Sequence, residues 1–239
     1  MDHSRREAFL ELVRSRGPLV VPSMLMCDFG HLAQEVQRLE QAGVQALHLD
    51  VMDGHFVPNS TYGLLLVETF QRISRLPLDV HLMISNPEQY VERYIEAGAW
   101  TLTVHLEAVP EPGGVLERIR RLGVAAGLAL NPETPLEKLI PWLSHCDYVV
   151  VMTVSPGYGG QQLQHHALEK AVRLRQDFPE LLMEVDGGIK HANAAEVVRA
   201  GANLLAVGSA IFRHHDYGQA VSELEEQIRQ GQTSEKGPC

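Results

Sequence analysis

The feature that most constrains the fold of this chain is a regular alternation between two kinds of segment. Short runs rich in Val, Leu and Ala are each followed by a longer segment whose apolar residues recur at helical spacing. The pattern predicts a strand followed by a helix, repeated eight times. The predicted strands cover residues 19–26, 46–51, 78–84, 101–106, 125–130, 148–154, 181–185 and 204–207.

Strands that are apolar along their whole length and alternate with helices predict a parallel sheet covered by helices, an α/β architecture. Eight such units in 239 residues favour a single closed (β/α)8 TIM barrel over an open sheet. An open dinucleotide-binding sheet would carry G-x-G-x-x-G after its first strand, whereas residues 26–30 read Met-Cys-Asp-Phe-Gly. No nucleotide cofactor is therefore expected. Glycines close four of the predicted helices, namely Gly43, Gly98, Gly123 and Gly201.

The domain layout that follows is one barrel with two short extensions. Residues 1–17 form an N-terminal arm whose Phe9, Leu10 and Val13 predict a short amphipathic helix, which covers either the base of the barrel or a partner. The barrel takes up residues 18–229. Residues 230–239 are polar and rich in Gly and Gln, which predicts a disordered tail.

Composition narrows the classes of partner and compartment. A formal net charge of -10 argues against nucleic acid or an anionic membrane as the main partner. The apolar runs are far shorter than the roughly 18 residues of a membrane span, and residues 1–17 lack the pattern of a signal peptide. The three cysteines have no metal-type spacing and fit a reducing compartment. We therefore expect a soluble, cytoplasmic protein.

Polar side chains at the carboxyl ends of three predicted strands form a candidate metal site. In a barrel these strand ends face the active site, and His48 and Asp50 share one face of their strand because side chains alternate. His81 lies on the next strand and Asp186 at the end of the seventh. Two imidazoles and two carboxylates suit Zn²⁺, Fe²⁺, Mn²⁺ or Co²⁺.

The same residues suit a particular reaction. Because the second and seventh strands are well separated around the ring, Asp50 and Asp186 can address opposite faces of one bound substrate. One carboxylate would remove a proton next to a carbonyl, the metal would stabilise the enediolate, and the other carboxyl group would return a proton, as in a two-base epimerase. An apolar collar around that intermediate would come from Met52, Met83 and Met152.

Glycine-rich loops follow the last three predicted strands and predict a phosphate site. Backbone N–H groups approach an anion closely where glycine stands, and barrels often hold phosphate in the loops after strands seven and eight. The loop residues concerned are Gly157, Tyr158, Gly159, Gly160, Gly187, Gly188, Gly208 and Ser209.

These segments together resemble the ribulose-phosphate 3-epimerase family. The run His-Leu-Asp-Val-Met-Asp-Gly-His-Phe-Val-Pro-Asn over residues 48–59 is the most specific match, and the resemblance extends over about residues 20–212. The other matching segments are residues 22–25, 78–83, 131–135, 152–161, 184–189 and 208–212.

The resemblance implies a metal-dependent barrel enzyme of the pentose phosphate pathway that interconverts D-ribulose 5-phosphate and D-xylulose 5-phosphate. It implies one divalent metal per subunit, Zn²⁺ before Fe²⁺, Mn²⁺ or Co²⁺, with Asp50 as proton acceptor and Asp186 as proton donor. Ser23, His81 and the glycine loops would contact the ketose phosphate. The family also implies a homo-oligomer, either a dimer or a hexamer. The implied metal ligands are His48, Asp50, His81 and Asp186.

Departures from the family pattern leave the substrate open. Met26, Tyr62 and Ser155 differ from the usual residues, and the Met-Cys pair at 26–27 is similar to that of allulose 6-phosphate 3-epimerases. A hexose phosphate epimerase is therefore the first alternative, and a non-catalytic sugar-phosphate-binding barrel is the second. A Schiff-base aldolase is disfavoured because none of the four lysines stands at a predicted strand end in a catalytic setting.

Overall fold

Eight parallel strands form the centre of the computed structural model, which describes residues 4–233. Hydrogen-bonded neighbours follow the order β1-β8-β7-β6-β5-β4-β3-β2, and a bridge between Ser23 and His48 links β1 to β2, so the sheet is nearly closed into a barrel. The predicted TIM barrel is confirmed. The strands are β1 (Leu19–Pro22), β2 (Leu47–Met52), β3 (Leu78–Met83), β4 (Thr101–His105), β5 (Ala125–Leu130), β6 (Tyr148–Met152), β7 (Leu182–Asp186) and β8 (Leu204–Val207).

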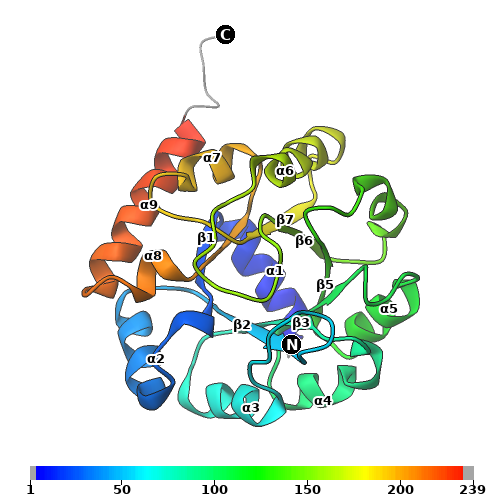
Figure 1. The fold of residues 1–239 in the computed structure, drawn as a ribbon, viewed down its shortest axis with the longest axis horizontal. Helices are drawn as coiled ribbons and strands as arrows, with labels where there is room; N and C mark the ends of the chain where they lie inside the picture. Colours follow the sequence, from blue (N-terminus) through cyan, green and yellow to red (C-terminus); the bar gives the residue numbers. More distant parts are fainter. Residues whose placement is uncertain (1–3, 234–239) are drawn as a thin grey trace.

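A ring of helices surrounds the barrel (Figure 1). Glycines with positive φ end several of them, among them Gly43 at 86° and Gly98 at 117°, as their sequence positions predicted. No helix within residues 4–233 combines the length and apolar character needed to cross a membrane. The helices are α1 (Arg5–Arg16), α2 (Leu32–Gln41), α3 (Leu64–Ile73), α4 (Val91–Glu96), α5 (Gly113–Arg121), α6 (His165–Asp177), α7 (Ala194–Arg199), α8 (Ser209–Phe212) and α9 (Tyr217–Thr233).

Several element boundaries differ from the sequence expectation. The first strand ends at Pro22, and a 3-10 turn over Met24–Met26 replaces its predicted last residues. This turn carries the chain across the end of the barrel, where the Ser23 amide donates to the Val207 carbonyl at 3.0 Å. The last helix continues to Thr233, and residues 234–239 of the predicted tail lie outside the described residues.

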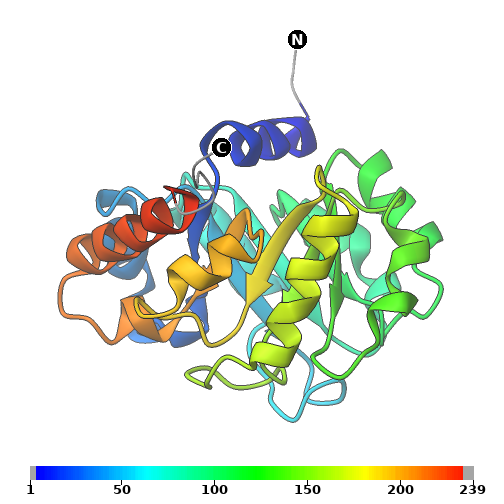
Figure 2. The ribbon, with the colours of Figure 1, turned by 90° about the horizontal axis from the view of Figure 1, so that it is seen from above.

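Helix α1 lies across the end of the barrel at which the strands begin (Figure 2). Phe9, Leu10 and Val13 on this helix are buried and join a cluster with inward side chains of the strands, including Tyr148. Arg6 fixes the helix further through paired hydrogen bonds of 2.9 and 2.7 Å to the Asp147 carboxylate. The arm therefore covers the barrel base, one of the two positions that its sequence allowed, and the loops after the strands gather at the opposite end.

Candidate active site and metal centre

Four predicted metal ligands meet at the carboxyl ends of β2, β3 and β7. His48, Asp50, His81 and Asp186 are all buried, and each offers one ligand atom within 4.8 Å of the others. The strand register explains part of this arrangement, because Asp50 pairs with His81 across β2 and β3. Parallel strands with side chains alternating between barrel interior and exterior thus bring together residues that are far apart in the sequence.

Two ring nitrogens in this cluster lack a hydrogen-bond partner, namely His48 Nε2 and His81 Nδ1. His48 Nε2 lies 3.4 Å from Asp50 Oδ1 and 3.7 Å from Asp186 Oδ2, and His81 Nδ1 lies 3.5 Å from Asp186 Oδ2. A buried polar atom without a partner costs free energy, and two imidazole lone pairs facing two carboxylates are satisfied by a cation between them. The residues present therefore fit a divalent metal ion.

The electrostatics of the site also favour positive charge at His48. Burial alone would lower the pKa of His48, but the carboxylates of Asp50, Glu184 and Asp79 outweigh it and hold that pKa well above its ordinary value. Burial, reinforced by the charge of Asp79, raises the pKa of Glu184 to about 8, so this group is mainly neutral at pH 7. A metal ion at His48 Nε2 would replace the proton that these carboxylates attract.

Asp79 orients His48 from below the metal cluster. Its Oδ2 lies 2.7 Å from His48 Nδ1, and its Oδ1 accepts hydrogen bonds from Thr101 and from the Tyr148 hydroxyl. Burial would raise the pKa of Asp79, but His48 and these hydroxyls bring it down to about 2. The ionised carboxylate therefore holds a proton on His48 Nδ1 and leaves Nε2 free for a metal.

Asp50 is held by hydrogen bonds from two neighbouring elements. Its Oδ2 accepts a 2.6 Å hydrogen bond from Ser23 Oγ, and its backbone amide donates to the Tyr62 hydroxyl at 3.0 Å. Burial would raise the pKa of Asp50, but His48, His81 and the Ser23 hydroxyl hold that pKa below its ordinary value. The carboxylate is therefore ionised at neutral pH, as a general base requires.

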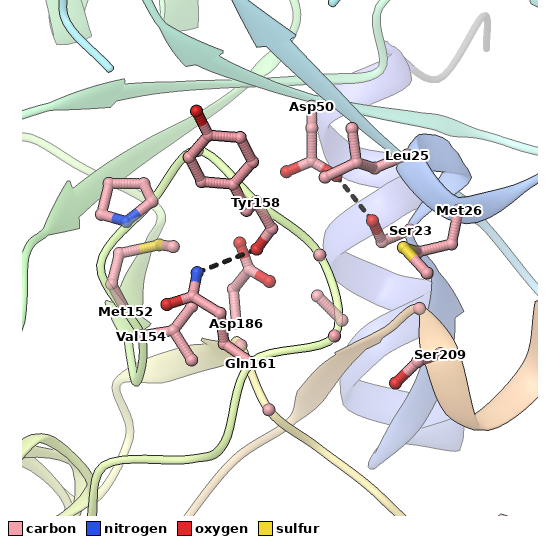
Figure 3. Close-up of a pocket in the computed structure, with 18 of the residues that line it drawn as sticks. Ser23, Leu25, Met26, Asp50, Met152, Val154, Tyr158, Gln161, Asp186 and Ser209 are labelled. Atoms are coloured by element: carbon pink, nitrogen blue, oxygen red, sulfur yellow. Dashed lines mark hydrogen bonds between the residues drawn. The ribbon is translucent and has the colours of Figure 1, made fainter. Parts of the chain in front are cut away.

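A cavity opens above these carboxylates, with Ser23, Asp50 and Asp186 in its wall (Figure 3). All predicted substrate-contacting residues line it except His81, which is buried behind it. The three methionines of the predicted collar line it as well. The cavity is thus polar where the carboxylates lie and apolar around them.

The loop after β6 closes over this cavity. Tyr158 donates its hydroxyl to the Pro58 carbonyl at 2.7 Å, and Asn59 Nδ2 donates to the Gly157 carbonyl at 2.6 Å. Beside this loop, at the end of the neighbouring strand β7, Gly187 and Gly188 have φ of 116° and 70°. A Cβ at Gly188 would lie 2.3 Å from the Leu163 amide nitrogen, so only glycine fits this crossing of backbones.

Sequence analysis did not assign two residues that lie beside the ligands. His105 and Glu107 extend from β4, where His105 is buried and its Nε2 lies 2.8 Å from His81 Nε2. Burial lowers the pKa of His105 even though Glu107 counteracts it. The sequence feature that could have identified them is their spacing. His105 and Glu107 are two positions apart at the end of a predicted strand, as His48 and Asp50 are. His55, by contrast, is exposed and turns back onto the Asp53 carbonyl at 2.9 Å.

Comparisons with known proteins agree with this geometry. The family model described as "Ribulose-phosphate 3 epimerase family" matches residues 19–212. A ribulose-phosphate 3-epimerase of Bacillus subtilis (strain 168) is 44% identical over 210 residues, covering 86% of this chain and 97% of that relative. The chloroplastic ribulose-5-phosphate-3-epimerase of Arabidopsis thaliana is 42% identical over 213 residues, covering 87% and 76%.

A solved structure of 3-hexulose-6-phosphate synthase shares the fold, with a TM-score of 0.68 at 15% identity over 88% of this chain and 99% of that one. At this identity the likeness concerns the fold alone. The family model, by contrast, matches residues 19–212, a range that contains every residue of the metal cluster. The chain therefore belongs to the ribulose-phosphate 3-epimerase family.

Proposed function

We propose that this protein is a metal-dependent 3-epimerase that interconverts D-ribulose 5-phosphate and D-xylulose 5-phosphate. The observation that carries the proposal is that Asp50 and Asp186 line one cavity from different strands, beside two histidines with free ring nitrogens. Family membership supports the same reaction, because the B. subtilis and A. thaliana relatives bear the name of this enzyme.

The two aspartates divide the proton transfers between them. Asp50 is ionised and held by Ser23, so it takes the C3 proton of ribulose 5-phosphate onto its carboxylate. Asp186 returns a proton to C3 from the other side, and the configuration at that carbon is inverted. A divalent ion held by His48, Asp50, His81 and Asp186 would supply the positive charge that stabilises the enediolate. Zn²⁺ is our first choice, and Fe²⁺, Mn²⁺ and Co²⁺ suit the same ligands.

We expect the phosphate group to bind where the loops after β7 and β8 line the cavity. Backbone amides of Gly187, Gly188, Gly208 and Ser209 stand at two adjacent strand ends and line the cavity there. Glycine lets these amides approach an anion without steric obstruction by a side chain. Met52, Met83 and Met152 exclude water from the reacting carbons and favour the delocalised intermediate.

The pentose is proposed as the substrate because the sequence relatives bear the name of ribulose-phosphate 3-epimerase. Met26 lies beside the glycines at one end of the cavity, since a Cβ at Gly159 would be 2.3 Å from Met26 Sδ and one at Gly208 would be 3.1 Å from Met26 Cγ. Because the Met-Cys pair at 26–27 is similar to that of allulose 6-phosphate 3-epimerases, D-allulose 6-phosphate is the alternative substrate.

Proton NMR in deuterated water tests the proposal with both substrates in parallel. The metal-analysed enzyme receives D-ribulose 5-phosphate in one sample and D-allulose 6-phosphate in another, and C3 exchange and epimer formation are followed. We expect faster exchange and epimer formation with the pentose. Faster turnover of the hexose would refute the pentose assignment and leave the mechanism in place. No exchange with either, under any of the four metals, would make the protein a non-catalytic binder.

A further inference from the structure

We propose that His105 and Glu107 are positioning residues that hold His81 in the one tautomer able to bind a metal through Nδ1. The proposal rests on the metal centre of the proposed function and adds two residues to it. Neither residue lines the cavity, and His105 is completely buried. Their effect is therefore exerted through His81, with which His105 is in direct contact.

The contact between the two imidazoles is a hydrogen bond. The Nε2 atoms are 2.8 Å apart, the ring planes are within 11° of parallel, and the ring centroids are 4.9 Å apart. With the closest approach at these nitrogens, the rings meet edge to edge and do not overlap face to face. A distance of 2.8 Å between two nitrogens requires one proton between them, because two bare lone pairs or two N–H groups would repel.

The neighbours of the two rings decide which nitrogen carries that proton. His105 Nδ1 lies 3.1 Å from Glu107 Oε2, and an ionised carboxylate only accepts, so His105 Nδ1 is protonated. A neutral imidazole has one N–H, which leaves His105 Nε2 as an acceptor. His81 Nε2 must then donate to it, and His81 Nδ1 is left with its lone pair directed at the metal cluster.

The opposite assignment, with protons on His105 Nε2 and His81 Nδ1, is unfavourable at both histidines. It would place a bare His105 Nδ1 against the Glu107 carboxylate at 3.1 Å. It would also place a proton on His81 Nδ1, which is buried and makes no hydrogen bond; its nearest carboxylate oxygen, Asp186 Oδ2, lies 3.5 Å away. Because an unpaired lone pair beside a carboxylate is the more costly of these losses, the contact between His105 and Glu107 decides the tautomer.

The second histidine of the cluster is held in the same way. His48 Nδ1 lies 2.7 Å from the ionised Asp79, which leaves His48 Nε2 for the metal. Each histidine is therefore tied to an ionised carboxylate on its far side, directly to Asp79 in one case and through His105 to Glu107 in the other. Carboxylates in this position fix ring orientation and raise the basicity of a ligand, and their loss typically weakens metal binding ten- to hundredfold.

Glu107 is itself fixed by the loop after β5. Its Oε1 accepts a 2.8 Å hydrogen bond from the Asn131 amide and a second from the Thr134 hydroxyl. Lys170 on α6 holds that loop through the carbonyls of Asn131 and Thr134, at 3.0 and 2.7 Å. Burial would raise the pKa of Glu107, but His105, Thr134 and the Asn131 amide lower it to about 2, so it stays an acceptor.

Nitrogen-15 NMR of the complete, unaltered chain reads the tautomers directly. Long-range proton–nitrogen correlations are recorded on histidine-labelled protein without metal and with Zn²⁺, and His81→Gln and His105→Gln spectra assign the two rings. We expect protonated Nε2 on His81 and protonated Nδ1 on His105 in both states. A protonated Nε2 on His105 would overturn the proposal, whichever metal is present.

Titration with Co²⁺ alone, followed by its visible absorption, measures the consequence for metal binding without substrate. We expect Co²⁺ affinity to fall ten- to hundredfold in His105→Phe and Glu107→Gln, and to be largely retained in His105→Gln, whose amide oxygen still accepts from His81. Glu133→Gln is the matched control, because Glu133 is 84% exposed on the same loop. Affinities within twofold of the parent in both loss variants would overturn the proposal.

The two experiments also separate this proposal from the proposed function. A parent protein that takes up no Co²⁺ would refute the metal centre, while the tautomers of His81 and His105 would still be decided by NMR. A parent that binds Co²⁺ tightly but shows the opposite tautomers would refute the positioning role alone.

Discussion

At the scale of single residues, the proposed mechanism assigns the proton transfers to Asp50 and Asp186, and removing the charge of either tests its role. We expect Asp50→Asn and Asp186→Asn each to lower kcat by about 10²-fold or more, the usual contribution of general acid–base catalysis. The fold should survive, because asparagine has nearly the shape of aspartate and the apolar core of the barrel does not include these two side chains. Steady-state kinetics and far-ultraviolet circular dichroism check both expectations.

Asp177→Asn is a suitable control for this pair, because Asp177 lies on α6 with half of its side chain exposed, at 51%. Its turnover should match that of the parent protein. Near-normal kcat in either cavity variant would contradict the two-base assignment, whereas a loss confined to one of them would leave a single catalytic carboxylate.

Asp53 provides a pH-dependent contribution to stability at the end of β2. Its carboxylate accepts hydrogen bonds of 2.8 Å from the amides of His55, Phe56 and Ser85. Slight burial would raise the pKa of Asp53, but these amides lower it to about 2 from 3.8. Because the folded pKa is the lower one, the stabilisation is complete above about pH 4 and is lost as the pH falls towards 2.

We therefore expect Asp53→Asn to reduce the free energy of unfolding by about 1 kcal/mol at pH 7, a value that allows for solvent screening. The deficit should shrink between pH 4 and pH 2, where the parent loses the same advantage. Urea unfolding of both proteins at pH 7, 5 and 3 measures it. A deficit that does not change with pH would mean that the charge of Asp53 contributes nothing.

At the scale of elements, a hydrogen bond from the Tyr158 hydroxyl closes the loop after β6. A phenylalanine at this position could not make this hydrogen bond. Tyr158 is 57% exposed, and its hydroxyl donates to the Pro58 carbonyl at 2.7 Å. We expect Tyr158→Phe to raise the KM for ribulose 5-phosphate several-fold, since an exposed hydrogen bond contributes about 0.5–1.5 kcal/mol. Because kcat depends on Asp50 and Asp186, it should change less than twofold.

Steady-state kinetics and amide hydrogen exchange of residues 157–161 test this role of the loop. Faster exchange confined to these residues is the expected companion of the higher KM. Tyr90→Phe, which alters a tyrosine next to α4 and outside the active-site cavity, serves as the control. Unchanged KM and unchanged exchange in Tyr158→Phe would show that the hydroxyl does not hold the loop.

Helix α1 lies outside the part of the chain that matches the family, yet it is packed into the barrel base. Phe9 is 1% exposed, and its ring centroid lies 6.4 Å from that of Tyr148. We expect Phe9→Ala to cost about 3–5 kcal/mol of stability, as for other buried aromatic truncations, with kcat within twofold of the parent. Denaturant unfolding and kinetics check this, with exposed Glu11→Ala as control. A loss below about 1 kcal/mol would contradict the packing role.

The element pattern could be predicted where periodicity reports burial directly. All eight strands are buried on both faces, so each is a mainly apolar run in the sequence, and the polar residues within the runs are the exceptions that build the site. The end of β1 was misplaced because Met24 is apolar and fully buried in a 3-10 turn, where periodicity cannot separate it from a strand. After β5 the chain forms two 3-10 turns, Leu136–Lys138 and Ile140–Trp142, because Pro135 and Pro141 interrupt a longer helix.

The candidate site was predictable only within single strands. Alternation places His48 with Asp50 on one face of a strand, whereas Glu107 lies two residues beyond the end of β4. Whether His105 reaches His81 depends on the stagger between β3 and β4, in which His81 pairs with Thr103. That stagger follows from closure of the whole barrel, to which every strand contributes, and no single segment of sequence contains it.

At the scale of the whole molecule, the barrel concentrates like charge at one end, and a bound cation should stabilise the complete fold. His48 is surrounded by the buried carboxyl groups of Asp50, Asp79, Glu184 and Asp186, all of which come from strands of the same sheet, and Glu184 is the one that is mainly neutral at pH 7. A ligand that binds only the folded state stabilises it by about 2.7 kcal/mol at a hundred times its Kd. For a chain of this size, that corresponds to a rise in Tm of roughly 5–10 °C.

We therefore expect chelation to abolish epimerase activity and to lower Tm, and addition of Zn²⁺, Fe²⁺, Mn²⁺ or Co²⁺ to restore both. Differential scanning calorimetry with and without metal, beside kinetics on the same samples, measures the two effects. His81→Gln separates site binding from nonspecific effects of the ion, because its Tm should no longer respond to metal once a ligand is missing. Full activity after metal removal verified by elemental analysis would exclude the metal from the reaction, whereas a metal-dependent Tm without metal-dependent activity would make the centre purely structural.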